Sequence, residues 1–193
     1  MSDTRTRILD EAMRLFLVGG YTATSLRMIA DAIGITQAAV YYHFRAKDDL
    51  LVGLVDPLMG SYDAVLTAAE ERADRERVVD RRALLGAILD HLREHRDALT
   101  LVTGDLAVGR HPAYAPRIER AATRFAALVA APDDLAAVTL ARAALAVLVT
   151  PVVESPAREV DEVREVLLDA AVRVLDTPYR ATGNPVGGRV GTR

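Results

Sequence analysis

Residues 24–47 read TSLRMIADAIGITQAAVYYHFRAK, and this stretch decides the fold. Its first half predicts a short helix that begins after Thr24 as N-cap and ends at Gly34, a residue free to adopt positive φ. One face of that helix is apolar, because apolar residues recur at helical spacing: Leu26, Ile29, Ala30 and Ile33. Ile35 fills the turn, and Thr36 is the expected N-cap of a second helix.

The second helix has two different faces. Val40 and Phe44 lie one turn apart and are expected to pack against the first helix. The remaining residues are small or carry hydrogen-bonding groups, as a helix inserted in a DNA groove requires: Gln37, Ala38, Ala39, Tyr41, Tyr42 and His43. The pair of helices is therefore a candidate helix-turn-helix.

The residues in this register resemble the DNA-binding domain of the TetR family of transcriptional repressors. The resemblance rests on Gly20-Tyr21, the helix from Leu26 to Gly34, Ile35-Thr36, the run from Val40 to Phe44, and Lys47. It covers about the first quarter of the chain, and the remainder agrees only in length and helical character. The resemblance implies a three-helix head whose residues 37–43 enter the major groove.

The same resemblance implies which residues contact DNA. Gln37 and Arg27 are the candidates for base contacts, since Gln pairs with adenine and Arg with guanine. Ala38 and Ala39 touch methyl groups or permit close approach, which leaves room for readout of DNA shape. The expected phosphate contacts are Thr24, Thr36, Tyr41, Tyr42, His43 and Lys47.

Composition indicates an all-α protein. Of 193 residues, 51% are hydrophobic, alanine and leucine dominate, and β-branched alternation is scarce. There is no cysteine, which excludes disulfides and thiolate metal sites. The N-terminus shows no signal peptide, so a cytoplasmic location is expected.

Charge is distributed unevenly along the chain. Residues 1–47 carry six Lys or Arg and four Asp or Glu, whereas residues 48–177 carry fifteen against twenty-three. Residues 178–193 add three Arg and no acid. The head is suited to a polyanion and the acidic body is not.

Periodicity predicts about nine helices. We expect residues 1–47 to be the DNA-binding domain, 48–177 an effector-binding and dimerisation bundle, and 178–193 a disordered tail. Pro57 should kink or break the fourth helix. The expected helices cover residues 3–18, 24–34, 37–43, 47–73, 83–96, 97–108, 113–131, 135–153 and 158–177.

The eighth helix, residues 135–153, is nearly all apolar. It has roughly the length of a membrane span, but Arg142 near its middle and its many alanines disfavour insertion. Its small residues would allow close approach of a second helix. Ala144 is one of them, and it is expected to lie in the contact between two subunits. We therefore expect a homodimer through helices eight and nine; the alternative is a wholly internal core helix.

Residues 91–95, HLREH, match the H-x-x-E-H pattern of some zinc peptidases. His91 and His95 lie one turn apart, but no convincing third ligand follows, so surface or pocket-lining histidines are the preferred interpretation. No phosphate loop or nucleophile elbow is present. The sequence predicts no catalytic residues, no metal, no cofactor and no enzymatic activity.

The preferred function is a ligand-responsive regulator, a repressor that binds a palindromic operator as a dimer and is released by a small hydrophobic effector. The alternatives are an architectural DNA-binding protein without effector, which the acidic body disfavours, or a helical enzyme. Helical faces suggest the pocket lining Leu85, Ile88, His91, Leu92, Leu99, Thr103, Phe125, Leu128 and Thr139. The candidate polar groups for orienting a ligand are His91, Asp105, Arg124 and Arg142.

Overall fold

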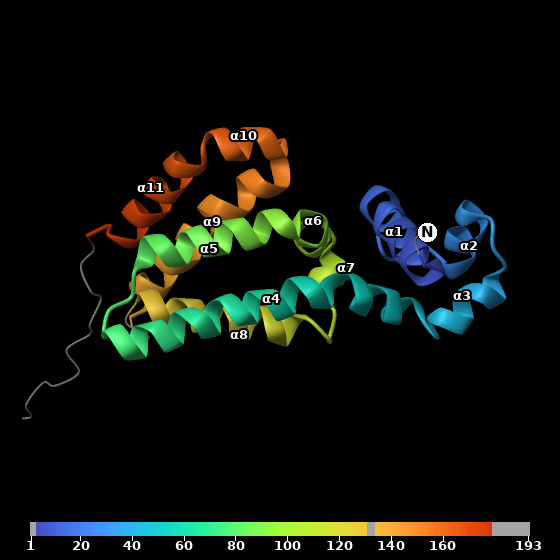
Figure 1. Cartoon of the computed structure of the whole chain (residues 1–193), viewed down its shortest axis with the longest axis horizontal. Helices are drawn as coiled ribbons and strands as arrows, with labels where there is room; N and C mark the ends of the chain where they lie inside the picture. The colour runs from blue at the N-terminus through green and yellow to red at the C-terminus, as the bar shows by residue number, and fades with distance from the viewer. Residues whose placement is uncertain (1–2, 131–133, 179–193) are drawn as a thin grey trace, which may run out of the picture.

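The computed structural model describes residues 3–130 and 134–178. In these ranges the chain is all-α, as predicted, and forms eleven helices (Figure 1). Three short helices make a head at one end, and the long α4 leads from the head into the body (Figure 1). The helices are α1 (Thr4–Gly19), α2 (Leu26–Ile33), α3 (Gln37–His43), α4 (Lys47–Glu76), α5 (Arg81–Glu94), α6 (Arg96–Gly104), α7 (Leu106–Gly109), α8 (Ala115–Val129), α9 (Leu135–Glu154), α10 (Ala157–Glu162) and α11 (Arg164–Leu175).

The head follows the expected local signals with one exception. Gly34 ends α2 in the left-handed conformation at φ 71°, and the Thr36 side chain accepts a hydrogen bond from Ala39 N at 3.1 Å. The N-cap of α2 is Ser25, whose side chain accepts from Met28 N, so the prediction of Thr24 was wrong. Thr24 turns inward instead, because its hydroxyl donates to Gly20 O.

The long helix α4 continues through Pro57 without a break. Of the two outcomes expected at Pro57, a kink or a break, the break does not occur. Proline lacks an N–H, so the carbonyl one turn earlier, at Gly53, loses its usual intrahelical donor. Four residues later, Ser61 Oγ donates to Pro57 O at 2.7 Å. Gly53 also lies close to α1, since a Cβ placed there would come within 3.0 Å of a Leu9 methyl.

Two predicted helices are each divided. The expected helix 97–108 is α6 and α7, separated at Asp105, whose carboxylate caps α7 through Ala107 N. The expected helix 158–177 is α10 and α11, separated at Val163. Gly104 is the last residue of α6 and directly precedes the first division, whereas no glycine or proline adjoins Val163 at the second.

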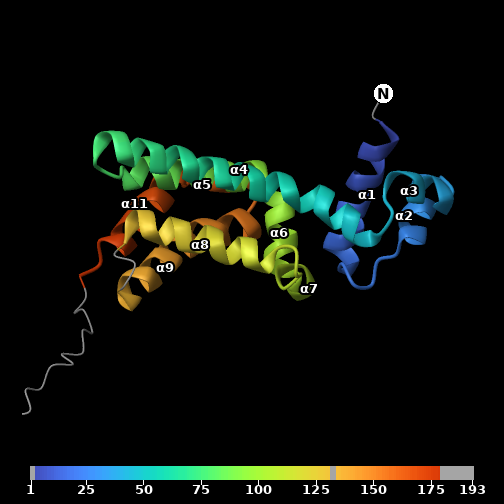
Figure 2. The same cartoon turned by 90° about the horizontal axis from the view of Figure 1, so that it is seen from below.

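The body consists of two layers of helices. In Figure 2, α4 and α5 lie on one side and α8 and α9 on the other. Helix α11 packs on α9 and α5. Two clusters of buried apolar residues result: one fills the body, and the other joins the head to the start of α4 and to α6 and α7.

Ala144 belongs to the core of a single subunit. It is completely buried, as are Ala141 and Leu148 on the same face of α9, and all three contribute to the body cluster. The prediction that Ala144 lies at a seam between subunits was therefore wrong. The outer face of α9, which includes Ala143 and Ala146, remains exposed.

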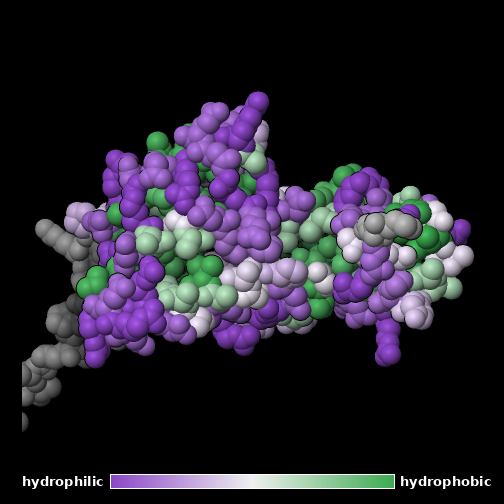
Figure 3. All heavy atoms as spheres, in the orientation of Figure 1, coloured by the Kyte–Doolittle hydropathy of each residue, from purple (hydrophilic) through white to green (hydrophobic). Residues whose placement is uncertain are grey.

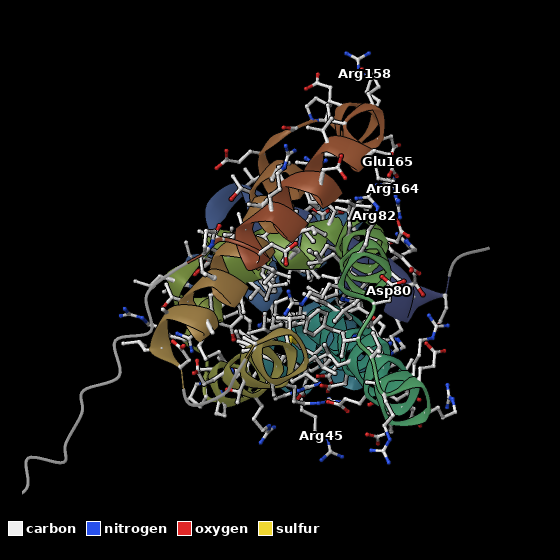
Figure 4. All side chains as sticks on the ribbon, turned by 90° about the vertical axis from the view of Figure 1, so that its left-hand side faces the viewer. Arg45, Asp80, Arg82, Arg158, Arg164 and Glu165 are labelled. Atoms are coloured by element: carbon white, nitrogen blue, oxygen red, sulfur yellow. The ribbon has the colours of Figure 1, made fainter. Side chains whose placement is uncertain are left out.

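Ion pairs join α11 to α5. Arg82 pairs with Glu165 at 2.6 Å, and Arg164 pairs with Asp90 at 2.8 Å. Figure 4 shows Arg82, Arg164 and Glu165 together where α11 crosses α5, whereas Arg158 points away. These side chains are partly exposed, so they orient the helices more than they stabilise them.

Two helices, α4 and α9, are long and apolar enough to pass a length-and-composition test for a membrane span. Both pack within the bundle, where their buried residues belong to the apolar clusters. The expected tail 178–193 lies almost wholly outside the described residues, as do residues 131–133 of the connection before α9. Asp134, at the end of that connection, caps α9 by accepting a hydrogen bond from Ala136 N.

Gly34 and Gly60 allow the cost of a left-handed residue to be measured. A Cβ at either would meet no atom within 4 Å, so only the backbone differs: Gly34 has φ +71° and Gly60 is helical. Gly34→Ala is expected to lower the free energy of unfolding by about 1–2 kcal/mol. Gly60→Ala is expected to raise it by about 0.5–1 kcal/mol. Urea denaturation at matched protein concentration measures both, and equal effects would contradict this account of the turn.

Candidate nucleic-acid interface and ligand cavity

The outward face of α3 is the candidate nucleic-acid interface. Val40 is completely buried and Phe44 nearly so, and both belong to the apolar cluster of the head, in which α3 packs on α2. On the other side Gln37 and Ala38 are exposed, and Tyr42 is 86% exposed. A large aromatic side chain left this open in a packed head favours contact with another molecule.

Eight of the ten predicted DNA contacts lie on accessible or partly accessible positions of α2 and α3. Arg27 projects from α2, where its guanidinium lies 3.6 Å from the Asp31 carboxylate. Thr36 is exposed, although its oxygen also caps α3. Exposed or half-buried alongside them are Gln37, Ala38, Ala39, Tyr41, Tyr42 and His43.

Thr24 and Lys47 are used inside the head. Thr24 is only 3% exposed, so its side chain is turned away from solvent. The Lys47 ammonium donates to three carbonyl oxygens, at 2.8 Å to Tyr21, 3.2 Å to Thr22 and 3.1 Å to Thr24. It also lies 4.3 Å from the centre of the Tyr21 ring, in a cation–π contact. All three N–H donors of Lys47 thus hold the loop before α2.

Tyr21 connects the head to two different helices of the body. Its backbone N–H donates to Asp105 Oδ2 at 2.7 Å, and its hydroxyl donates to Asp48 at the start of α4. Burial raises the pKa of Tyr21, and the hydrogen bond from Tyr21 lowers the pKa of Asp48. His111 adds a ring nitrogen 3.6 Å from Asp48. No local sequence pattern predicts the contact with Asp105, because Asp105 lies 84 positions from Tyr21.

A cavity of about 210 Å³ lies in the body between α4, α5, α6, α8 and α9. Five of the nine predicted lining residues line it: Ile88, His91, Leu92, Leu99 and Thr103. Leu85 and Phe125 are instead completely buried in the core, and Thr139 is exposed on α9. Leu128 packs against the body core and does not line the cavity.

Sequence reasoning missed nine of the fourteen lining residues. Helical faces alone did not show which turn of α4, α8 or α9 faces inward, and these helices supply most of the remaining residues. They are Leu58, Met59, Tyr62, Val102, Ile118, Ala121, Ala122, Leu145 and Val149. Of the polar candidates, only His91 lines the cavity. Asp105 caps α7, Arg124 pairs with Glu70 at 2.7 Å, and Arg142 pairs with Glu119 at 2.9 Å.

His91 is buried at 5% exposure and belongs to a small polar cluster. Its Nδ1 lies 3.1 Å from Ser61 Oγ, and His95 Nε2 lies 2.9 Å from the same oxygen. Burial lowers the pKa of His91 to about 4, so the ring is neutral near pH 7. Among the described residues, no group of three His, Cys, Asp or Glu side chains is placed to hold a metal ion.

A second hollow of about 350 Å³ lies between the C-terminal half of α4 and the start of α5. Figure 3 shows apolar residues gathered along this α4–α5 face, within a mainly hydrophilic surface. Its rim carries Glu71, Arg72 and Arg75. It is larger than the inner cavity but remote from the head, and no predicted site residue lines it.

Comparison with known proteins agrees with this arrangement. Residues 8–54 match the family described as bacterial regulatory proteins, tetR family. Over this quarter of the chain, the head is similar to TetR-family DNA-binding domains. The matched residues run from α1 into α4 and include the whole helix-turn-helix.

One similar protein is the HTH-type transcriptional repressor KstR2 of Rhodococcus jostii, 41% identical over 40% of this chain and 41% of KstR2. The chain thus spans less than half the length of that relative. Among solved structures, AmtR of Mycobacterium smegmatis is 26% identical with a TM-score of 0.63, covering 93% of this chain and 89% of AmtR. The multidrug binding protein EbrR, complexed with malachite green, is 26% identical with a TM-score of 0.56, covering 92% and 100%.

Lys47 in the head allows a stability role to be separated from a phosphate contact. Lys47→Met keeps the aliphatic stem and removes the three hydrogen bonds, so we expect a loss of about 1–3 kcal/mol in unfolding free energy. Arg45→Met, at an exposed position next to it, should change stability by less than about 0.5 kcal/mol. Unchanged stability of Lys47→Met, with a salt dependence of DNA binding reduced by about one charge, would instead support the phosphate role.

Proposed function

We propose that this protein is a ligand-responsive transcriptional repressor, which binds a palindromic operator as a homodimer and is released by a small hydrophobic effector. The observation that carries the proposal is the exposed face of α3 in a TetR-family head, with Gln37 at its capped N-terminus. In this proposal residues 1–47 read DNA and residues 48–177 bind effector and partner subunit. Such a regulator acts in the cytoplasm, where bacterial DNA lies.

The proposed DNA contacts divide into two kinds. Gln37 and Arg27 meet base edges, since one begins α3 and the other projects from the neighbouring α2. Tyr41, Tyr42, His43 and Thr36 position the helix against phosphates. Thr24 and Lys47, which are engaged within the head, support this surface without supplying a free side chain to DNA.

Operator binding tests the proposed base contacts of Gln37 and Arg27. We expect the protein to bind DNA upstream of its own gene at half-sites roughly 34 Å apart, or a multiple of that spacing. Gln37→Ala and Arg27→Ala should each relax base preference by about 1–3 kcal/mol at one position of the half-site. Tyr42→Ala is the comparison, because loss of a phosphate contact weakens all sequences alike. Mobility shifts with single-base operator variants measure this, and uniform weakening by Gln37→Ala would count against base readout.

The proposed dimer interface is the outer face of α9 with α11. Ala143 and Ala146 on α9 are exposed and small, and Val166 on α11 is 62% exposed. Exposed apolar side chains on two adjacent helices favour burial against a second copy of the same surface. A four-helix contact of α9 and α11 from each subunit would bury them.

A pair of exposed valines tests this interface. Val166→Glu places a charge in the proposed contact, where desolvation without a partner is unfavourable, so we expect monomers at concentrations that keep the wild type dimeric. Val78→Glu alters a valine that is 66% exposed in the α4–α5 connection and should leave the dimer intact. Sedimentation velocity measures both. A fully dimeric Val166→Glu would exclude this position from the interface.

The proposed ligand response follows from the helices shared by cavity and head. Helix α6 lines the cavity with Leu99 and Val102 and ends at Asp105, which holds Tyr21 N. Helix α4 lines the cavity with Leu58 and begins next to Asp48, which holds the Tyr21 hydroxyl. A ligand that changes the separation of α4 and α6 therefore acts on the head at Tyr21. The structure of EbrR with malachite green, a protein similar over nearly its whole length, supports such a cavity.

Release from DNA requires a ligand that prefers the conformation in which the two heads no longer fit one face of the duplex. Linkage then requires that operator weaken ligand binding by the factor by which ligand weakens operator binding. A thermal-shift screen of hydrophobic compounds supplies the ligand, and calorimetry with and without operator measures the factor. Equal affinity in both titrations would remove the induction mechanism and leave DNA binding in place.

Asp105→Ala should reduce this coupling while the cavity still binds ligand. It removes the N-cap of α7 and the hydrogen bond to Tyr21 N, so we expect the ratio of ligand affinities without and with operator to fall towards one. Asp80→Ala is the matched control, because Asp80 caps α5 through Ala83 N. Asp80 belongs to the connection between α4 and α5, which lies at the end of the body opposite the head (Figure 1). Equal coupling in the two variants would show that Tyr21 is not the link.

A further inference from the structure

We propose that the cavity selects an uncharged, largely apolar ligand that donates a hydrogen bond, such as a phenol or an alcohol, to Nε2 of His91. This inference rests on the proposed ligand response and specifies the chemistry of the molecule that occupies the site. It follows from the positions of protons in the Ser61, His91 and His95 cluster and from the residues that surround it.

The proton count in the cluster is determined by Pro57. Ser61 Oγ lies 2.7 Å from Pro57 O, and a carbonyl oxygen has no proton, so the single hydroxyl proton of Ser61 occupies this contact. Towards the two histidines Ser61 can then only accept. His91 Nδ1 at 3.1 Å and His95 Nε2 at 2.9 Å must both be protonated donors. The oxygen uses its proton and both lone pairs.

The other nitrogen of His91 is therefore an acceptor. The ring is neutral near pH 7 because burial lowers its pKa to about 4, and a neutral imidazole carries one proton. With Nδ1 protonated, Nε2 has a free lone pair. This atom is buried and has no hydrogen-bond partner among the described residues. A ligand that donates a proton to Nε2 would satisfy an acceptor whose burial otherwise destabilises the fold.

The rest of the lining determines the remainder of the ligand. Apart from His91, the residues that line the cavity carry no ionisable group except the Tyr62 phenol, and burial raises the pKa of that phenol. Thr103 already donates its proton to Leu99 O at 2.8 Å, so it offers a ligand only lone pairs. A charged ligand would find no counter-ion there. A flat apolar molecule with one donating hydroxyl matches these surfaces.

Calorimetry on the full chain with 2-naphthol and 2-methoxynaphthalene tests the inference. The ether carries a methyl group in place of the hydroxyl proton, so it cannot donate a hydrogen bond. We expect wild type to bind 2-naphthol roughly five- to tenfold more tightly than the ether. His91→Leu should lose that preference and His91→Gln should recover part of it, since the Gln oxygen accepts. His95→Gln is the control, because His95 contacts the same Ser61 oxygen but does not line the cavity.

The outcomes separate this inference from the proposed function. Equal binding of both probes to wild type would overturn donor selection and leave the ligand site intact. Binding of neither probe, in protein that still binds operator, would remove the ligand site itself and the inference with it. A nitrogen-15 spectrum of the imidazole rings at pH 7 provides a test without ligand. A free lone pair on His91 Nε2 supports the inference, and a proton there overturns it.

Discussion

The hydrogen bonds of Tyr21 are the constraint on which the arrangement of head and body depends. One residue is held through its backbone by Asp105, at the junction of α6 and α7, and through its hydroxyl by Asp48, at the start of α4. The Lys47 ammonium holds the same loop through its contact with the face of the Tyr21 ring. Because the partners belong to different helices of the body, the head cannot keep both contacts if α4 and α6 move apart. Its orientation is therefore tied to whatever occupies the space between those helices.

Local structure could be predicted from the sequence where a single residue type determines the backbone. Gly34 adopts positive φ and ends α2, Thr36 caps α3, and Val40 faces inward, each as its chemistry requires. The predicted N-cap of α2 was wrong by one residue, and this error changed the role assigned to Thr24. Thr24 and Ser25 are both good caps, and only the fold decides which of them faces the buried carbonyl of Gly20.

Long-range structure could not be predicted in the same way. Gly104 and the N-cap Asp105 mark the division of α6 from α7 locally, but the pairing of Asp105 with Tyr21, 84 positions away, is encoded by no local pattern. Ala144 looked equally suited to a partner subunit and to the interior, since an alanine-rich helix packs closely on either. The structure places it inside, against the body core. For the cavity, periodicity indicated Ile88 and Leu92 on α5 but could not show which turns of α4 and α8 lie opposite.

Pro57 is the point at which the first part of α4 can bend most easily relative to the rest of the helix. Its missing N–H leaves the Gly53 carbonyl without the usual partner, so the helix resists bending least at this turn. On the head side of the same turn, α1 packs closely on Gly53, where a Cβ would come within 3.0 Å of a Leu9 methyl. Pro57 and Lys47 are ten residues apart, or about 15 Å along the axis. A tilt of about 10° at the proline displaces the start of the helix by about 2.5 Å. A small bend at Pro57 would thus move the start of α4, and with it the head, by more than the bend displaces the residues around the proline itself.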